Sequence, residues 1–116
     1  LQGLYTMRSE TLKSSLSPER KKLLELMQEI NNGRIEGIQV RDSEPLFDPP
    51  PTTYKLFIFD KPNIPNASIK KQDYMLKRRV VELFDLFDEM KSFYIKELTI
   101  SDGLPIRMFD MSKNLV

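Results

Sequence analysis

The chain has 116 residues, a length typical of a single domain. Its hydrophobic content of 40% and charged content of 30% are ordinary for a soluble globular protein, and its net charge of +1 gives no general attraction to nucleic acid or to an anionic membrane. The chain contains no cysteine and no histidine, so it lacks thiolate metal sites, cysteine nucleophiles, the commonest metal ligand and the commonest general base near neutral pH. These absences predict a cytoplasmic protein that is not an enzyme, with no catalytic, cofactor-binding or metal-binding residues.

Residues 1–16 are expected to be loosely ordered, because residues 7–16 are polar and rich in serine. Residues 1–6 precede Met7, a candidate native start, and are read as a cloning remnant or a cropped end. No stretch approaches the roughly 18 apolar residues that span a bilayer, and the start lacks the pattern of a secretory signal. No membrane association is predicted.

The first predicted helix begins at Ser17 and Pro18. Serine accepts hydrogen bonds from the free N–H groups at a helix start, and proline suits the first helical position. Asn31-Asn32-Gly33 supplies a left-handed stop. The apolar stripe between these signals consists of Leu23, Leu24, Leu26, Met27 and Ile30.

A strand–turn–strand pattern is predicted over residues 35–46 and again over residues 95–106. Asp42-Ser43 and Asp102-Gly103 are the predicted tight turns. In each copy, the first two apolar residues are three positions apart and the next two are two positions apart. A regular strand places the residues of one face two positions apart, so we expect either a helix–strand corner at the first residue or a β-bulge in each copy. The irregular sets are Ile35, Ile38 and Val40 in the first copy and Ile95, Leu98 and Ile100 in the second.

The segment Asp48-Pro49-Pro50-Pro51-Thr52 separates the two copies and is read as a stiff spacer. A ligand for a proline-binding module is the alternative, but the flanking residues lack the basic pattern of such ligands. Residues 54–59 then predict a β-strand, followed by a loop over residues 60–65. The strand is apolar on both faces, so it is either covered twice or faces a partner. Phe57 and Phe59 are therefore core residues or contact residues.

The second predicted helix begins between Ala67 and Asp73 and runs to about Lys91. Its expected core stripe is Leu76, Val80, Leu83, Phe84 and Phe87, with Tyr74, Val81 and Met90 at the margins.

This order of elements predicts an α+β two-layer sandwich, with two helices on one face of an antiparallel sheet of four or five strands. Leu23-Leu24-Glu25-Leu26 recurs as Val80-Val81-Glu82-Leu83, and a similar hairpin follows each run. A duplicated α-β-β unit with an approximate internal two-fold is therefore expected. The single domain 1–116 would contain units at 17–48 and 67–110, joined by the spacer, extra strand and loop of 49–66.

Each half resembles a group of very short, uncharacterised bacterial proteins built from one helix and one hairpin. The shared features are the leucine-rich helical run, the corner Asn32-Gly33-Arg34-Ile35 and the aspartate-containing turn. This chain differs in having two units joined by a proline spacer and an extra strand. The resemblance implies the unit's shape, and it implies no activity, cofactor or functional residue.

Two sets of carboxylates have competing interpretations. Asp42 and Asp102 hold equivalent positions, so a two-fold could bring two acids together for acid/base or metal chemistry. We favour the turn interpretation, because the side chain of an aspartate in a tight turn forms hydrogen bonds with backbone groups close to it in the chain. The second set lies mainly on the outer side of the second predicted helix. We interpret it as the solvent-exposed face of that helix rather than as a metal site. It consists of Glu82, Asp85, Asp88 and Glu89.

A basic cluster near the start of the second helix could contact the phosphates of a nucleic acid. Tyr74 is the only aromatic residue among these basic residues, and the sequence contains no recognisable nucleic-acid-binding motif. The cluster consists of Lys70, Lys71, Lys77, Arg78 and Arg79.

The second helix is positive in its first half and negative in its second, the reverse of what the helix dipole favours. Two antiparallel copies of the helix would bring the charges at residues 77–79 opposite those at residues 85–89, which predicts a symmetric homodimer. We expect a non-catalytic interaction or regulatory module that self-associates or binds an unidentified protein. The alternative is a nucleic-acid-binding regulator that uses the basic cluster. The candidate interface residues are Phe57, Phe59, Asp85, Asp88 and Glu89.

Overall fold

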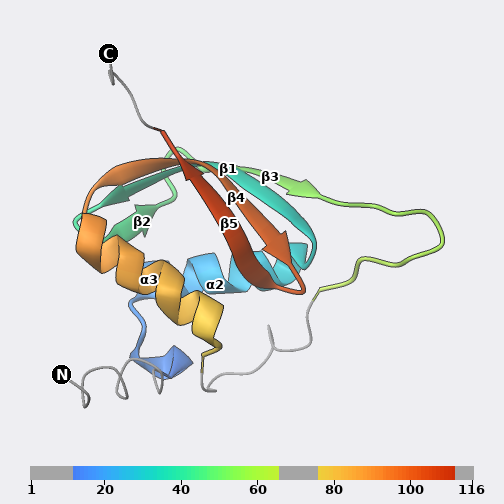
Figure 1. The fold of residues 1–116 in the computed structure, drawn as a ribbon, viewed down its shortest axis with the longest axis horizontal. Coiled ribbons are helices and arrows are strands. Elements are labelled where there is room, and N and C mark those ends of the chain that lie inside the picture. The colour runs from blue at the N-terminus through green and yellow to red at the C-terminus, as the bar shows by residue number, and fades with distance from the viewer. Residues whose placement is uncertain (1–11, 66–75, 112–116) are drawn as a thin grey trace.

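The computed structural model describes residues 12–65 and 76–111. These residues form two layers: an open antiparallel sheet of five strands, and two helices that lie against one face of it (Figure 1). The predicted α+β class, helix number and sheet type are confirmed. The helices are α2 (Pro18–Ile30) and α3 (Arg78–Met90), and a short 3-10 helix, η1 (Lys13–Ser15), precedes α2. The strands are β1 (Gly33–Arg41), β2 (Glu44–Leu46), β3 (Thr52–Lys55), β4 (Phe93–Ser101) and β5 (Leu104–Asp110).

Helix α2 begins and ends as its capping residues predict. The Ser17 side chain accepts a hydrogen bond from the Arg20 backbone N–H at 3.1 Å, and Pro18 is the first helical residue. Asn31 ends the helix with a φ of 61°, and its N–H donates to the Met27 carbonyl at 2.9 Å. The predicted stripe faces the sheet: Leu23, Leu24, Met27 and Ile30 are buried, and Leu26 packs against them partly buried.

The expectation of loose order is wrong for residues 12–16. Lys13 and Leu16 are buried, and the Lys13 ammonium lies 2.9 Å from a carboxylate oxygen of Glu25 on α2. A lysine can be buried at this depth because its charge is paired. Residues 1–11 lie outside the described residues.

Helix α3 begins later than predicted, at Arg78. Residues 66–75 lie outside the described part of the chain, whereas Leu76 and Lys77 are described and are not helical. No described side chain caps the start of α3: Lys77 holds the N-cap position and makes no side-chain cap hydrogen bond, so no cap residue marks this start. The predicted core stripe is confirmed, because Leu76, Val80, Leu83, Phe84 and Phe87 are all buried.

Strands β1 and β4 form the centre of the sheet and pair antiparallel, from Gly33 opposite Ile100 to Val40 opposite Phe93. Strand β5 continues the sheet beside β4. On the other side, β2 and β3 share the edge of β1, where β3 pairs with residues 33–36 and β2 with residues 39–41. The proline spacer connects these two edge strands.

The irregular apolar step lies inside both central strands, so the predicted corner is wrong. The predicted bulge is supported in β4, where a register shift accompanies the step. In β4 the pairing with β5 shifts register between Ile95 and Glu97. In β1 the step falls at Gly37, whose φ of 84° favours glycine.

The helices, central strands and turns of the two halves correspond, whereas the outer strands differ, with three residues in β2 and seven in β5. Both helices have 13 residues and both central strands have nine. Both predicted turns have positive φ at their two central residues. Each turn also bonds to the helix–strand corner of the other half: the Ser43 N–H donates to the Lys91 carbonyl at 2.7 Å, and the Gly103 N–H donates to the Asn31 carbonyl at 2.8 Å. The halves therefore interlock. Their origin by duplication stays a prediction.

Candidate functional site

The predicted strand over residues 54–59 is wrong beyond Lys55, where β3 ends. The residues that follow project from the sheet as a long loop, drawn at the right of Figure 1. We call residues 56–64 the arm. Phe57 is 70% exposed and Phe59 is 93% exposed, so neither is a core residue. Leu56, Ile58 and Ile64 are also at least half exposed, and the arm thus presents five large apolar side chains to solvent.

The base of the arm is fixed by hydrogen bonds to the corner between α2 and β1. The Leu56 N–H donates to the Asn32 carbonyl at 2.8 Å. The Asn63 side-chain amide donates to the Asn32 carbonyl and to the Leu56 carbonyl, both at 2.9 Å. Asn63 therefore holds the two ends of the arm together.

The tip of the arm is a closed turn. The Lys61 N–H donates to the Ile58 carbonyl at 2.9 Å, and Asp60 has a φ of 71°. Phe59 and Asp60 occupy the two central positions of this turn. An aromatic residue and an acidic residue, both exposed, therefore occupy consecutive positions at the end of a preformed loop.

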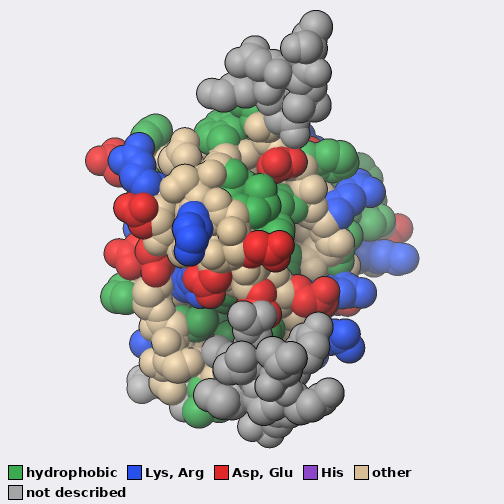
Figure 2. All heavy atoms as spheres, turned by 60° about the vertical axis from the view of Figure 1, so that its left-hand side comes forward, with side chains coloured by type: hydrophobic (Ala, Val, Ile, Leu, Met, Phe, Trp, Pro, Cys, Tyr) green, Lys and Arg blue, Asp and Glu red, His purple; other side chains and the backbone are tan. Residues whose placement is uncertain are grey.

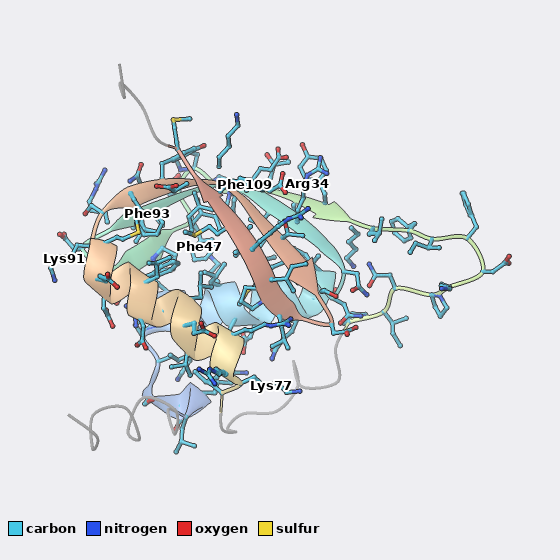
Figure 3. All side chains as sticks on the ribbon, viewed as in Figure 1. Arg34, Phe47, Lys77, Lys91, Phe93 and Phe109 are labelled. Carbon is cyan, nitrogen blue, oxygen red and sulfur yellow. The ribbon has the colours of Figure 1, made fainter. Side chains whose placement is uncertain are left out.

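Within residues 12–65 and 76–111, both helices lie on one face of the sheet, and we call the other face the open face. Figure 3 shows Arg34 and Phe109 on this side, whereas Phe47 and Phe93 lie on the helix side. The strand register places two rows of side chains across the open face. The first row runs Tyr54, Arg34, Thr99 and Arg107; the second runs Thr52, Glu36, Glu97 and Phe109.

The first row combines aromatic and cationic groups. The Arg34 guanidinium lies 4.2 Å from the centre of the Tyr54 ring, which is a cation–π contact. Arg34 also donates to Glu36 at 2.9 Å. Arg107 donates to the Thr99 hydroxyl at 3.4 Å, and no carboxylate of the described residues lies within ion-pair distance of it.

A groove of about 460 Å³ follows this row at the end of the sheet from which the arm leaves. Its size lies in the range of pockets that bind small groups. The groove is lined by both arginines of the row, by apolar atoms of Tyr54 and Ile106, and by Leu56 at the base of the arm. The arm and the groove are therefore adjacent on each copy of the chain.

The candidate acidic residues on α3 are partly engaged within the chain. Asp88 accepts a hydrogen bond from the Arg20 guanidinium at 2.6 Å, and Asp85 has an interaction of its own. Glu89 is exposed. An antiparallel pair of α3 helices would compete with the Arg20–Asp88 contact, and this weakens the predicted helix–helix dimer.

The basic cluster is only partly described, because Lys70 and Lys71 lie outside the described residues. Lys77, Arg78 and Arg79 are exposed at the start of α3. Arg78 pairs with Glu82, four residues further along α3, at 3.9 Å. Figure 2 shows positive and negative side chains close together around a hydrophobic area on the side that it turns forward, without a broad described surface of one sign.

The structure does not bring Asp42 and Asp102 together. Because β1 and β4 are antiparallel, the two turns lie at opposite ends of the sheet. The Asp42 N–H donates to the Ser92 hydroxyl and the Asp102 N–H to the Asn32 side-chain oxygen, both at 3.1 Å. Both aspartates thus belong to turns, and they form no shared acid site.

No group of three or more metal-ligating side chains occurs within residues 12–65 and 76–111. Among the helices that the structure describes, none has the length and apolar character needed to cross a membrane.

No protein-family model, curated protein or solved structure matches this chain. The arm and the open face are the candidate site, on the evidence of the arm's exposed apolar side chains and the groove beside them.

Sequence reasoning identified the arm's phenylalanines but missed the groove. Arg34 and Arg107 are far apart in the sequence, and only the strand register places them in one row. The alternation of polar residues in β1 and β4 was the available signal, because it marks one sheet face as uncovered.

Proposed function

We propose that the chain is a non-catalytic interaction module that self-associates through the arm. The main support is the exposure of five large apolar side chains on one preformed loop. Exposed apolar groups gathered in this way are typical of protein–protein contact sites. Since hydrogen bonds already order the arm, binding would cost less conformational entropy than binding through a floppy segment.

The proposal concerns the arm rather than the charged side of α3. The aromatic rings of Phe57 and Phe59 supply the kind of anchor that dominates interface energies, whereas exposed ion pairs contribute little. Asp88 is also committed to Arg20 within the chain. The cytoplasmic setting stays a prediction that rests on the absence of cysteine.

The double variant Phe57→Asp/Phe59→Asp should be monomeric where the wild-type chain is dimeric. Sedimentation-velocity ultracentrifugation at micromolar concentration measures this, and the dissociation constant should rise at least about tenfold because two anchors are lost. The thermal unfolding midpoint should stay close to that of the wild type, since both rings are exposed.

The matched control is Met90→Asp/Met111→Asp, which charges two exposed apolar residues elsewhere on the surface. This variant should keep the wild-type oligomeric state. A wild-type chain that stays monomeric at high micromolar concentration contradicts self-association, and equal weakening by both double variants contradicts the role of the arm.

Nucleic-acid binding is the second candidate, because Lys77, Arg78 and Arg79 are consecutive and exposed. Fluorescence anisotropy with labelled 20-nucleotide single-stranded and double-stranded probes tests it at two salt concentrations. Binding through phosphates should weaken steeply with salt and should be lost in Arg78→Glu/Arg79→Glu. On the self-association proposal, we expect no binding that depends on these two arginines.

A further inference from the structure

We infer that the arm of one copy docks in the groove on the open face of a second copy, and that the second copy's arm enters the groove of the first. The inference rests on the proposed self-association and specifies its contact. It assigns a role to Asp60 and Arg107, neither of which is among the candidate interface residues that the sequence predicted.

The arm cannot serve its own groove in the described conformation. Leu56 and Asn63 are bonded at the base to Asn32, and the arm leads away from the sheet (Figure 1). Leu56 also lines the groove, so the arm starts at the groove's rim. Two copies related by a two-fold axis can therefore exchange arms, and such an exchange closes on itself as a dimer instead of growing into a fibre.

The tip of the arm and the groove are complementary in chemistry. The tip offers the Phe59 ring and the Asp60 carboxylate, and no cation of the described residues lies within ion-pair distance of Asp60. The groove offers Tyr54 and Ile106 for the ring and Arg107 for the carboxylate. Phe59 can stack on the planar groups of the groove while Asp60 pairs with Arg107.

The apolar area is of the size that a dimer needs. Aromatic side chains bury about 150–250 Å² each, so the four phenylalanines of two arms would contribute on the order of 600 Å² or more. The groove surface that they cover adds a comparable area. The total approaches the roughly 1,200–2,000 Å² that stable interfaces bury.

The second row of side chains on the open face is also complementary in charge to the arm. Glu36 lies directly opposite Glu97 on the neighbouring strand, and like charges in that position destabilise a sheet. Arg34 offsets the charge of Glu36, whereas Glu97 accepts from the Thr99 hydroxyl. Lys61, next to Asp60 on the arm, would bring a cation toward these carboxylates in the docked pair.

A charge exchange tests the contact. Asp60→Arg alone and Arg107→Asp alone should each raise the dimer dissociation constant about tenfold or more, because each places like charges together. The double variant Asp60→Arg/Arg107→Asp restores opposite charges across the interface and should regain most of the wild-type affinity. Sedimentation equilibrium measures all four chains, and circular dichroism confirms that each remains folded.

The control is Arg78→Asp, which reverses a charge on a side chain that is 92% exposed on α3, and it should leave the dimer unchanged. If the wild type dimerises through Phe57 and Phe59 but both single reversals leave the dissociation constant unchanged, the groove is not the docking site and the self-association proposal still stands. If the reversals weaken the dimer and the double variant does not recover, direct pairing of Asp60 with Arg107 is contradicted.

Discussion

Replacing Phe87 with alanine should lower the free energy of unfolding by about 3–5 kcal/mol, the largest loss that we expect from a single substitution in this chain. Phe87 on α3 is fully buried. Its ring meets those of Phe84 and Phe93 edge to face, at centroid distances of 5.6 and 5.7 Å. Phe93 belongs to β4, so the three rings join the helix layer to the sheet.

The loss is large because neighbouring groups cannot collapse into the space that the ring leaves. Phe84 and Phe93 are held by a helix and a central strand, and residual cavities add to the lost transfer free energy. Small domains are stable by only about 5–15 kcal/mol, so the variant should unfold at much lower urea concentration. Urea titration followed by circular dichroism measures the change in midpoint.

Phe109→Ala is the matched control, since it removes the same ring from the open face, where Phe109 is 53% exposed. We expect a change near 0.5 kcal/mol or less for this variant. Similar losses for the two substitutions would mean that the aromatic cluster at Phe87 does not join the layers as described.

The elements that the sequence predicted well are those set by local signals. Ser17 and Pro18 mark the start of α2, and the spacing of its apolar residues identifies the buried side. Asp102-Gly103 adopts the left-handed conformation that its residue types favour. These features depend on neighbours within a few positions, so a single sequence suffices to predict them.

The end of β3 could not be predicted, because it depends on the length of its partner. Lys55 pairs with Gly33, which is the first residue of β1, and the other part of that edge is occupied by β2. Among the described strands, none pairs with the residues beyond Lys55, although their composition favours a strand. The arm is thus a β-rich segment whose partner strand has ended.

The groove could not be predicted either, because it too depends on how the strands pair. Tyr54, Arg34 and Arg107 share a row only because β3 pairs with β1, β1 with β4, and β4 with β5. A one-residue change of register would move every side chain of a strand to the other face. Both register shifts between β4 and β5 are of this kind, and no local pattern in the sequence fixes them.

Arg20 is the second residue whose loss should be severe, because it ties three parts of the fold together. Its guanidinium donates to the Ser43 carbonyl in the first hairpin at 2.9 Å and to Asp88 on α3 at 2.6 Å. It also lies 5.2 Å from the centre of the Phe84 ring. The side chain is only 13% exposed, so water replaces these contacts poorly.

We expect Arg20→Ala to lower the free energy of unfolding by about 2–3 kcal/mol. Arg20→Lys should recover less than half of this loss, because an ammonium group cannot bond in two directions as a planar guanidinium does. The part of the loss that comes from the Ser43 and Phe84 contacts should persist in 0.5 M NaCl, whereas salt should weaken the pairing with Asp88, whose side chain is 56% exposed. Arg78→Ala is the control, because its pairing with Glu82 is exposed and should contribute about 0.5 kcal/mol or less.

Urea titrations of the three variants at low and high salt distinguish a structural clamp from a surface charge. If Arg20→Ala costs no more than Arg78→Ala, or if salt abolishes its effect, Arg20 does not link the hairpin to α3. If the loss is as large as expected, the three Arg20 contacts together stabilise each copy, and the ion pair with Asp88 is one of them. A dimer that recruited Asp88 would then have to break this contact, so the arm is the surface that can associate without cost to the fold.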